Sequence, residues 1–218
     1  MYVKDRMSKN IVTVSKDLKI NQVLDIFESN DFHRLPVVDE KGFLIGLITE
    51  DTIQSHTPSK ATSLSIHELN YLLSKTTVES IMIKKVVTIK PNCLLEQAAE
   101  LMMHKDVSCL PVVSDDNRLL GIITQKDVLA SFVDLLGYHD VGSRIVIAID
   151  QDKVGLLAEI ASILAKENVS ISHLVVYRSD TVDVVIRVSD LDGQKVGKLL
   201  TEHGYQVVDI LINKGNSN

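Results

Sequence analysis

The sequence predicts a mixed α/β (α+β) protein, in which two copies of one β-α-β-β-α unit precede a smaller unit with the order β-α-β-β-α-β. The first observation is a repeated line: LPVVDEKGFLIGLIT at residues 35–49 returns as LPVVSDDNRLLGIIT at residues 110–124. The match extends without a gap over residues 3–53 and 78–128 at a constant offset of 75, which indicates two copies of one structural unit. The second observation is that the residues from 144 onward have no such copy and alternate strand and helix patterns of their own.

Composition limits the function classes. The chain of 218 residues is 45% apolar, enough for two to three small domains, and its net charge of −6 argues against a nucleic-acid partner. No apolar run approaches the roughly 20 residues of a membrane helix, and the charged N-terminus is not a signal peptide. Cys93 and Cys109 lack CxxC spacing. We therefore expect a cytoplasmic protein with free thiols.

Each repeated unit is expected to begin with a short strand, at 10–14 in the first copy and 85–89 in the second. Apolar residues at helical spacing follow, and then two apolar strands around a polar turn, at 35–38 and 44–49 in the first copy. A helix follows Thr49 and Thr124. One such unit of about 50 residues buries little surface, so the two copies are expected to pair.

A connector at 55–77 separates the copies. It is predicted to hold a loop and a short helix that begins with a capping box of Ser65 and Glu68, with Leu64 and Leu69 as a hydrophobic staple. The predicted divisions are then 1–54, 55–77, 78–136, a linker at 137–143, 144–213 and a tail at 214–218.

The last unit is predicted to contain strands at 144–150, 169–178, 180–190 and 205–212, with helices at 154–168 and 193–204. Gly137 and Gly142 mark its boundary, and Asn168 and Gly204 fall where helices end. This element order is a ferredoxin-like layout.

The stretch from Thr124 to Asp127 opens a helix directly after an apolar strand, and it has two interpretations. A hydroxyl at the first position and a carboxylate three residues later form an ordinary helix cap. The same geometry suits a ligand, because a helix N-terminus attracts phosphate and a carboxylate can accept from ribose hydroxyls.

Together, the doubled LPVV…LIGLIT lines and Thr124-Gln-Lys-Asp127 resemble a tandem pair of CBS domains over residues 3–136. Such pairs form a Bateman module and commonly bind adenosine ligands, such as AMP, ADP or ATP, in the cleft between the copies. The resemblance implies a nucleotide site in the second copy, with phosphate and ribose at Thr124 and Asp127. The implied border of the base is Thr88, Ser108, Cys109, Leu110 and Pro111.

The first copy departs from this pattern, because it reads Thr49-Glu-Asp51-Thr52. Its carboxylate lies one residue early, which rotates it by about 100° on a helix. The resemblance therefore implies a second site there that binds the nucleotide more weakly, binds another ligand or is empty. Its residues would be Thr13, His33, Arg34, Leu35, Pro36, Thr49 and Thr52. His33 and Arg34 could attract a phosphate or could form a solvated strand edge.

The C-terminal unit resembles an ACT domain on the motif Asp-Lys-Val-Gly-Leu-Leu at 152–157. The resemblance implies an amino-acid site, with the ligand carboxylate near Asp152, Val154, Gly155 and Leu156. The alternative is that Gly155 only permits a tight turn. The order of the three domains resembles AcuB-type acetoin utilisation proteins, whose setting is acetoin and acetate metabolism.

These observations favour a non-catalytic sensor of adenosine nucleotides that regulates a metabolic enzyme. The alternatives are an enzyme of acetoin catabolism and a ligand-free scaffold. The enzyme is disfavoured because no nucleophile or acid–base pair stands out and the seven histidines lack metal-ligand spacing. We also expect a homodimer or a larger even oligomer. The apolar face that predicts it is Val128, Phe132, Leu135 and Leu136.

Overall fold

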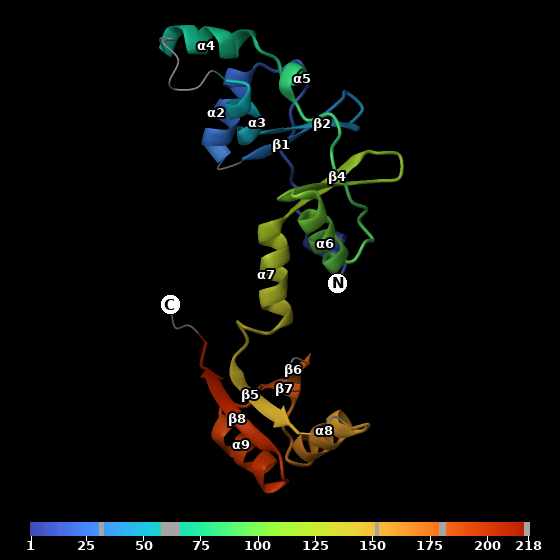
Figure 1. Ribbon diagram of the computed structural model, residues 1–218, viewed down its shortest axis with the longest axis vertical. Coiled ribbons are helices and arrows are strands. Elements are labelled where there is room, and N and C mark those ends of the chain that lie inside the picture. The colour runs from blue at the N-terminus through green and yellow to red at the C-terminus, as the bar shows by residue number, and fades with distance from the viewer. Residues whose placement is uncertain (31–32, 58–65, 151–152, 179–181, 216–218) are drawn as a thin grey trace. The chain divides into compact units, whose positions relative to one another are not determined.

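The computed structural model describes residues 1–30, 33–57, 66–150, 153–178 and 182–215. They form two compact units, Met1–Val128 and Leu129–Asn218 (Figure 1). The boundary falls inside helix α7 (Gln125–Leu135), ahead of the linker expected at 137–143. The predicted cap and staple of the connector helix depend on Leu64 and Ser65, which lie outside the described residues.

The first unit contains the two repeated copies. The first copy comprises α1 (Val3–Arg6), α2 (Ile20–Asn30), β1 (Arg34–Val38), β2 (Leu44–Thr49) and α3 (Glu50–Ser55). The connector helix α4 (Ile66–Lys75) follows. The second copy comprises α5 (Val78–Ile81), α6 (Leu95–Lys105), β3 (Cys109–Val113), β4 (Leu119–Thr124) and the start of α7. The predicted hairpins are present, as antiparallel pairs β1–β2 and β3–β4.

The strands predicted at 10–14 and 85–89 are reduced to single parallel bridges, Val14 with Val37 and Ile89 with Val112. The neighbouring proline explains the short ladder, because Pro36 accepts from Val14 N–H at 3.1 Å but has no N–H to return. The short helices α1 and α5, which precede these segments, were not predicted from the sequence.

The two copies exchange their N-terminal segments. Ser8, just after α1, forms a reciprocal pair of backbone hydrogen bonds with Ile122 of β4, at 2.9 and 3.0 Å. The matching pair in the other half joins Ile83 to Leu47 of β2, at 3.0 and 2.9 Å. Val3 of α1 is accordingly buried in the core of the second copy, and neither copy is complete without the other.

A glycine in each hairpin admits a methionine from the exchanged segment. A Cβ atom on Gly121 would lie 2.5 Å from Sδ of Met7, and one on Gly46 would lie 2.5 Å from Sδ of Met82. Because real Cβ atoms do not approach that closely, these two positions of the repeat require glycine for packing.

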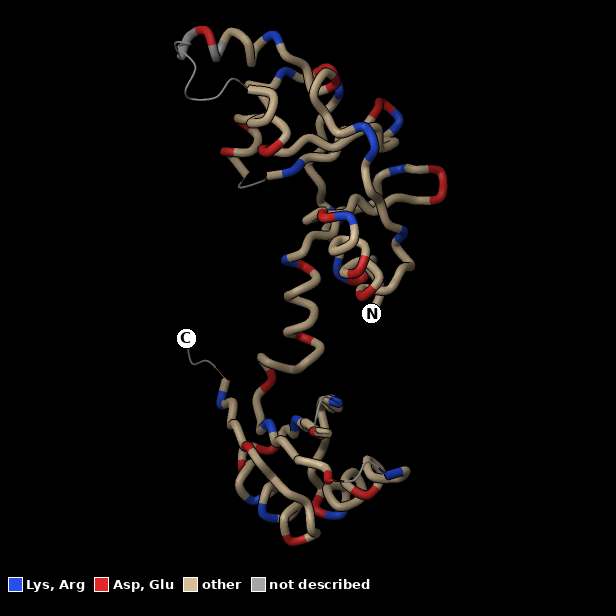
Figure 2. The backbone as a smooth tube through the Cα atoms, in the orientation of Figure 1, with Lys and Arg blue, Asp and Glu red and all other residues tan. Residues whose placement is uncertain are grey.

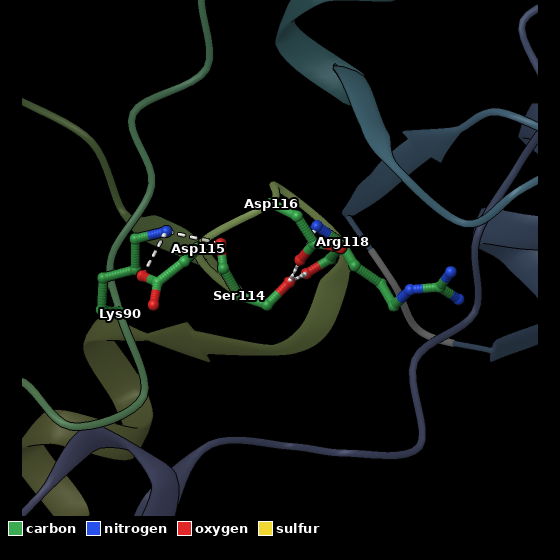
Figure 3. A network of polar contacts seen from close by, with 5 residues as sticks. All are labelled: Lys90, Ser114, Asp115, Asp116 and Arg118. Atoms are coloured by element: carbon green, nitrogen blue, oxygen red, sulfur yellow. Dashed lines mark hydrogen bonds and ion pairs between the residues drawn. The ribbon is translucent and has the colours of Figure 1, made fainter.

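The hairpin turns of the two copies also pair. Leu44 N–H donates to the carbonyl of Asn117 at 3.1 Å, and Leu119 N–H donates to that of Gly42 at 3.1 Å. The second turn is held by a polar network around Ser114, whose hydroxyl donates to Asp116 and whose carbonyl accepts from Lys90 (Figure 3). The Ser114 hydrogen bond lowers the pKa of the Asp116 carboxyl.

The second unit has the predicted order: β5 (Gly142–Ile149), α8 (Leu156–Lys166), β6 (Ile171–Arg178), β7 (Val182–Val188), α9 (Gly193–Glu202) and β8 (Gln206–Asn213). Its antiparallel sheet runs β6-β7-β5-β8, and α8 and α9 cover one face of the sheet. This is the ferredoxin-like layout expected. Asn168 and Gly204 take positive φ just after the two helices, as predicted for helix ends.

Among the helices that the structure describes, none is long and apolar enough to cross a membrane.

Candidate functional site

A cavity of about 630 Å³ opens in the first unit where the two copies meet. Four parts of the chain line it: the exchanged segment after α1, the start of β1, Ser108 just ahead of β3, and the junction of β4 with α7. The lining residues are Ser8, Asn10, Ile11, Val12, His33, Arg34, Leu35, Pro36, Ser108, Ile122, Thr124, Gln125, Lys126 and Asp127.

The junction of β4 and α7 presents a helix N-terminus to this cavity. Thr124 donates its backbone N–H and its hydroxyl to Oδ2 of Asp127, at 2.8 and 2.7 Å, and accepts from Asp127 N–H at 3.3 Å. These are the contacts of a capping box, which fix the carboxylate beside the free N–H groups of the first helical turn. The site therefore combines helix-end donors with an oriented acceptor.

Basic groups from the first copy face the same cavity. Nδ1 of His33 already has a partner in the same copy, since it lies 3.1 Å from Oε2 of Glu50. The guanidinium of Arg34 has no ion pair within the described part of the chain, and it is half-buried at the start of β1. An anionic group in the cavity would supply the missing partner for Arg34.

The first copy has the same helix start without the carboxylate. Thr49 and Thr52 share a hydrogen bond between their hydroxyls at 2.9 Å, and Thr52 N–H donates to Thr49 Oγ1 at 3.0 Å. Thr52 thus occupies the place of Asp127 but offers a hydroxyl. Asp51 is exposed and is not among the residues that line the cavity.

Comparison with known proteins identifies the repeated unit. The family model of the CBS domain matches residues 3–56 and 78–134, about half of the chain. This chain belongs to the CBS-domain family. The model of the ACT domain matches residues 145–203, which lie in the second unit.

Three relatives show the range of CBS proteins similar to this chain. A homoserine O-acetyltransferase from Methanohalobium evestigatum is 34% identical over 127 residues, which are 58% of this chain and only 23% of that protein. The CBS domain pair of protein MJ0100, solved in complex with 5′-methylthioadenosine and S-adenosyl-L-methionine, is 29% identical with a TM-score of 0.51. That match covers 62% of this chain and 97% of the pair. A putative acetoin utilization protein (AcuB) from Vibrio cholerae is 25% identical with a TM-score of 0.53, and the match covers 63% of this chain and 93% of that one.

The structure groups the predicted site residues differently from the sequence. The prediction kept each CBS copy separate, with Thr124 and Asp127 beside Thr88 and residues 108–111. In the cavity, Thr124 and Asp127 instead face His33, Arg34 and Pro36 of the other copy, and Ser108 is shared. Cys109, Leu110 and Pro111 do not line this cavity, and neither do Thr49 and Thr52. The exchanged segment reaches this cavity because Ser8 pairs with Ile122 of β4, the strand that leads into α7.

The remaining predicted residues lie elsewhere. Thr88 lines a separate open hollow beside α6, and Thr13 is exposed outside the cavity lining. Cys109 and Leu110 are buried in β3, and burial raises the pKa of the Cys109 thiol although the charge of Arg34 opposes the shift. Cys109 is therefore protonated at neutral pH, which suits a core residue.

Four lining residues of the exchanged segment, Ser8, Asn10, Ile11 and Val12, were missed by sequence reasoning. A signal was available: the repeat matches Met7 with Met82 and Gly121 with Gly46. To interpret this signal, one must know that each methionine packs on the glycine of the other copy. That contact joins residues far apart in the chain, so the sequence alone does not reveal it.

The candidate site in the ACT domain is partly assembled. Gly155 is the N-cap of α8 with φ of +93°, and it lines a hollow of about 240 Å³ with Leu156, Lys153 and Arg178. Val154 is fully exposed and does not line this hollow, and Asp152 lies outside the described residues. The positive φ supports the interpretation that Gly155 permits a tight turn. The cationic side chains of Lys153 and Arg178 in the same hollow are also compatible with an anionic ligand.

Proposed function

We propose that this chain is a non-catalytic sensor whose CBS pair binds an adenosine ligand in the cavity between the copies. The observation that carries the proposal is the capped start of α7. It places the carboxylate of Asp127 and a helix N-terminus in one cavity with the guanidinium of Arg34. The adenosine ligands of the MJ0100 pair support the same chemistry.

Each part of a nucleotide has a matching group. The ribose hydroxyls donate to Asp127, which the Thr124 hydrogen bonds already hold in place. A phosphate accepts from the first turn of α7 and pairs with Arg34. The base lies against the apolar part of the lining. That part consists of Ile11, Val12, Leu35, Pro36 and Ile122.

The regulatory role follows from binding without turnover. Occupation of the cavity fixes the two copies against each other, and the protein then controls a cytoplasmic metabolic enzyme. The similarity to the acetoin utilization protein favours acetoin or acetate metabolism as its setting. In the ACT domain, an amino acid is the proposed second ligand, with its carboxylate near Gly155 at the start of α8.

Calorimetry of the full chain with AMP, ADP, ATP, NAD and S-adenosylmethionine tests the nucleotide site. We expect one of these to bind without turnover, and Asp127→Ala to weaken it about tenfold or more, since hydrogen bonds to a charged group contribute roughly 1.5–3 kcal/mol. Asp51→Ala is the matched control, because it removes an exposed carboxylate from the first turn of α3, outside the cavity.

Three results would contradict the proposal. Equal nucleotide affinity of Asp127→Ala and wild type would show that the Thr124–Asp127 pair acts only as a helix cap. Turnover of the ligand would favour an enzyme. No binding of any of the five compounds would favour a scaffold.

A further inference from the structure

Three basic residues form a row across the open face of the C-terminal sheet. In the strand register, Arg144 of β5 lies directly opposite Arg187 of β7, and Arg187 lies opposite His173 of β6. The neighbouring residues Ile145 and Ile186 are buried under α8 and α9, so the row points to the other face. Directly opposed side chains have Cβ atoms about 5 Å apart, and like charges there are destabilising.

The carboxylates around this row do not neutralise its centre. Oδ2 of Asp209 lies 3.6 Å from Nη1 of Arg144, and Oδ2 of Asp140 lies 3.3 Å from Nδ1 of His173. Within the residues that the structure describes, no carboxylate is at ion-pair distance from the Arg187 guanidinium. Burial, together with the charge of Arg144, lowers the pKa of Arg187.

A polar atom beside Arg187 also lacks a partner. Nδ1 of His173 is buried and makes no hydrogen bond in the described structure, since its contact with Asp140 has ion-pair distance without hydrogen-bond geometry. An unpaired polar group in a buried position costs stability. Within the described residues, Arg187 thus lacks an ion-pair partner and Nδ1 of His173 lacks a hydrogen-bond partner.

Two cavities flank the arginines. One of about 380 Å³ and one of about 250 Å³ share Tyr138, Arg144 and Arg187. Asn213 fixes the wall of the larger one, because its Nδ2 donates to the carbonyls of Tyr138 and Asp140 at 3.1 and 2.9 Å. The smaller cavity is mostly apolar. Its apolar lining is Val133, Leu136, Val175 and Val185, beside the ring of Tyr177.

We propose that this face of the ACT domain binds a small organic carboxylate, whose carboxylate group lies between Arg144 and Arg187 and whose short apolar tail enters the smaller cavity. Guanidinium groups bind a carboxylate with two parallel hydrogen bonds, which relieves the opposition of the two arginines. This site is separate from the hollow at Gly155, because the two lining sets share no residue.

The test measures binding of isovalerate to the full chain by ligand-observed NMR, at constant ionic strength and without nucleotide. Isovalerate is expected to bind, and isovaleramide, which has the same tail without the charge, is not. Arg187→Gln should weaken binding about tenfold or more. Lys195→Gln is the control, since it removes an exposed cation of α9 that lines neither these cavities nor the hollow at Gly155, and its affinity should equal that of wild type.

Arg144→Gln gives an independent variant if Arg187→Gln does not fold, and circular dichroism checks both. Equal binding of isovalerate by wild type and both glutamine variants would overturn the proposal. Binding of the amide as tightly as the acid would overturn it as well, as would an absence of isovalerate binding up to millimolar concentration. Inorganic phosphate binding at Arg187 in place of isovalerate would overturn the carboxylate assignment.

Discussion

At the scale of single residues, Thr124 and Asp127 show why a cap and a ligand site are hard to separate from sequence. The hydrogen bonds that cap α7 are the same ones that orient the Asp127 carboxylate toward the cavity. Residue spacing alone cannot distinguish the two roles, because both need a hydroxyl and a carboxylate three residues apart. The distinction comes from Arg34 and His33, which packing brings from the other copy.

The weaker helix start of the first CBS copy provides a residue-scale prediction. Thr52→Asp places a carboxylate where Thr49 can donate to it, as Thr124 does to Asp127. We expect this variant to strengthen nucleotide binding less than Asp127→Ala weakens it, because Thr52 is only 9% exposed and a carboxylate at that position loses most of its hydration. Calorimetry of the two variants decides this, and a gain from Thr52→Asp that exceeds the loss from Asp127→Ala would contradict it.

Glu159 on α8 provides a prediction about pH. Its carboxylate accepts from Lys153 at 3.2 Å and from the hydroxyl of Tyr205 at 3.1 Å, and these hydrogen bonds lower its pKa below 4.5. The folded state thus binds the proton less well than the unfolded state. This contribution to stability is present above pH 4.5 and is lost as the pH falls through the lowered pKa.

In Glu159→Gln, melting of the ACT domain should accordingly depend less on pH below 4.5. The effect is small because the group is exposed. Lys198→Gln, which removes one partner of the exposed pair with Glu202, is the comparison variant. Identical acid profiles for Glu159→Gln and wild type would show that these contacts do not stabilise the fold.

At the scale of elements, the sequence predicts the helices and hairpins that depend on residues close together in the chain. The helices of the ACT domain follow apolar spacing, with Leu156, Ile160 and Leu164 buried as expected, and the hairpins follow their turn residues. The exchange of α1 and α5 between the copies could not be predicted, because a repeat states which residues are equivalent and not which copy each one contacts. The set of residues that line the candidate site could not be predicted either, because it depends on this exchange.

The exchange itself can be tested at Gly121. In Gly121→Ala, the new Cβ would lie 2.5 Å from Sδ of Met7 and 3.0 Å from the carbonyl oxygen of Ser8. We expect the free energy of unfolding of the CBS pair to fall by about 1–3 kcal/mol, the usual cost of overpacking. Urea denaturation measures it.

Met7→Ala in the same chain should restore part of the stability lost in Gly121→Ala, because it removes the nearest clashing atom. The two substitutions are then coupled, with the double variant less destabilised than their sum. Additive losses would show that α1 and β4 do not meet in this way.

At the scale of the whole molecule, α7 joins the two compact units and carries an apolar surface. No charged residue occurs between Val128 and Val133 (Figure 2). Val128 is buried in the CBS pair, whereas Phe132 and Leu135 are each 46% exposed. Apolar residues at helical spacing on an exposed face are typical of an interface.

We expect the homodimer, or larger even oligomer, to depend on this surface of α7. Light scattering at micromolar concentration should give an even multiple of the chain mass, and Phe132→Glu should shift the protein toward the monomer. Gln194→Glu adds the same charge at an exposed position of α9 and should leave the mass unchanged. A monomeric wild type would contradict the expectation.

The division into two compact units leads to a prediction about how ligand binding affects thermal stability. An adenosine ligand between the CBS copies binds only their folded, paired state, and at 100 times its Kd it should stabilise that state by about 2.7 kcal/mol. Each kcal/mol raises Tm by roughly 2–4 °C for a unit of this general size, so the shift should be about 5–10 °C. Calorimetric scans of the full chain should show this shift in the transition of the CBS pair alone, with Asp127→Ala needing more ligand for the same shift.

A fragment ending at Gly137 keeps all of α7 and should retain the shift, whereas a fragment starting at Gly142 should show none. A nucleotide-dependent shift in the ACT fragment, with none in the CBS fragment, would move the nucleotide site to the other unit.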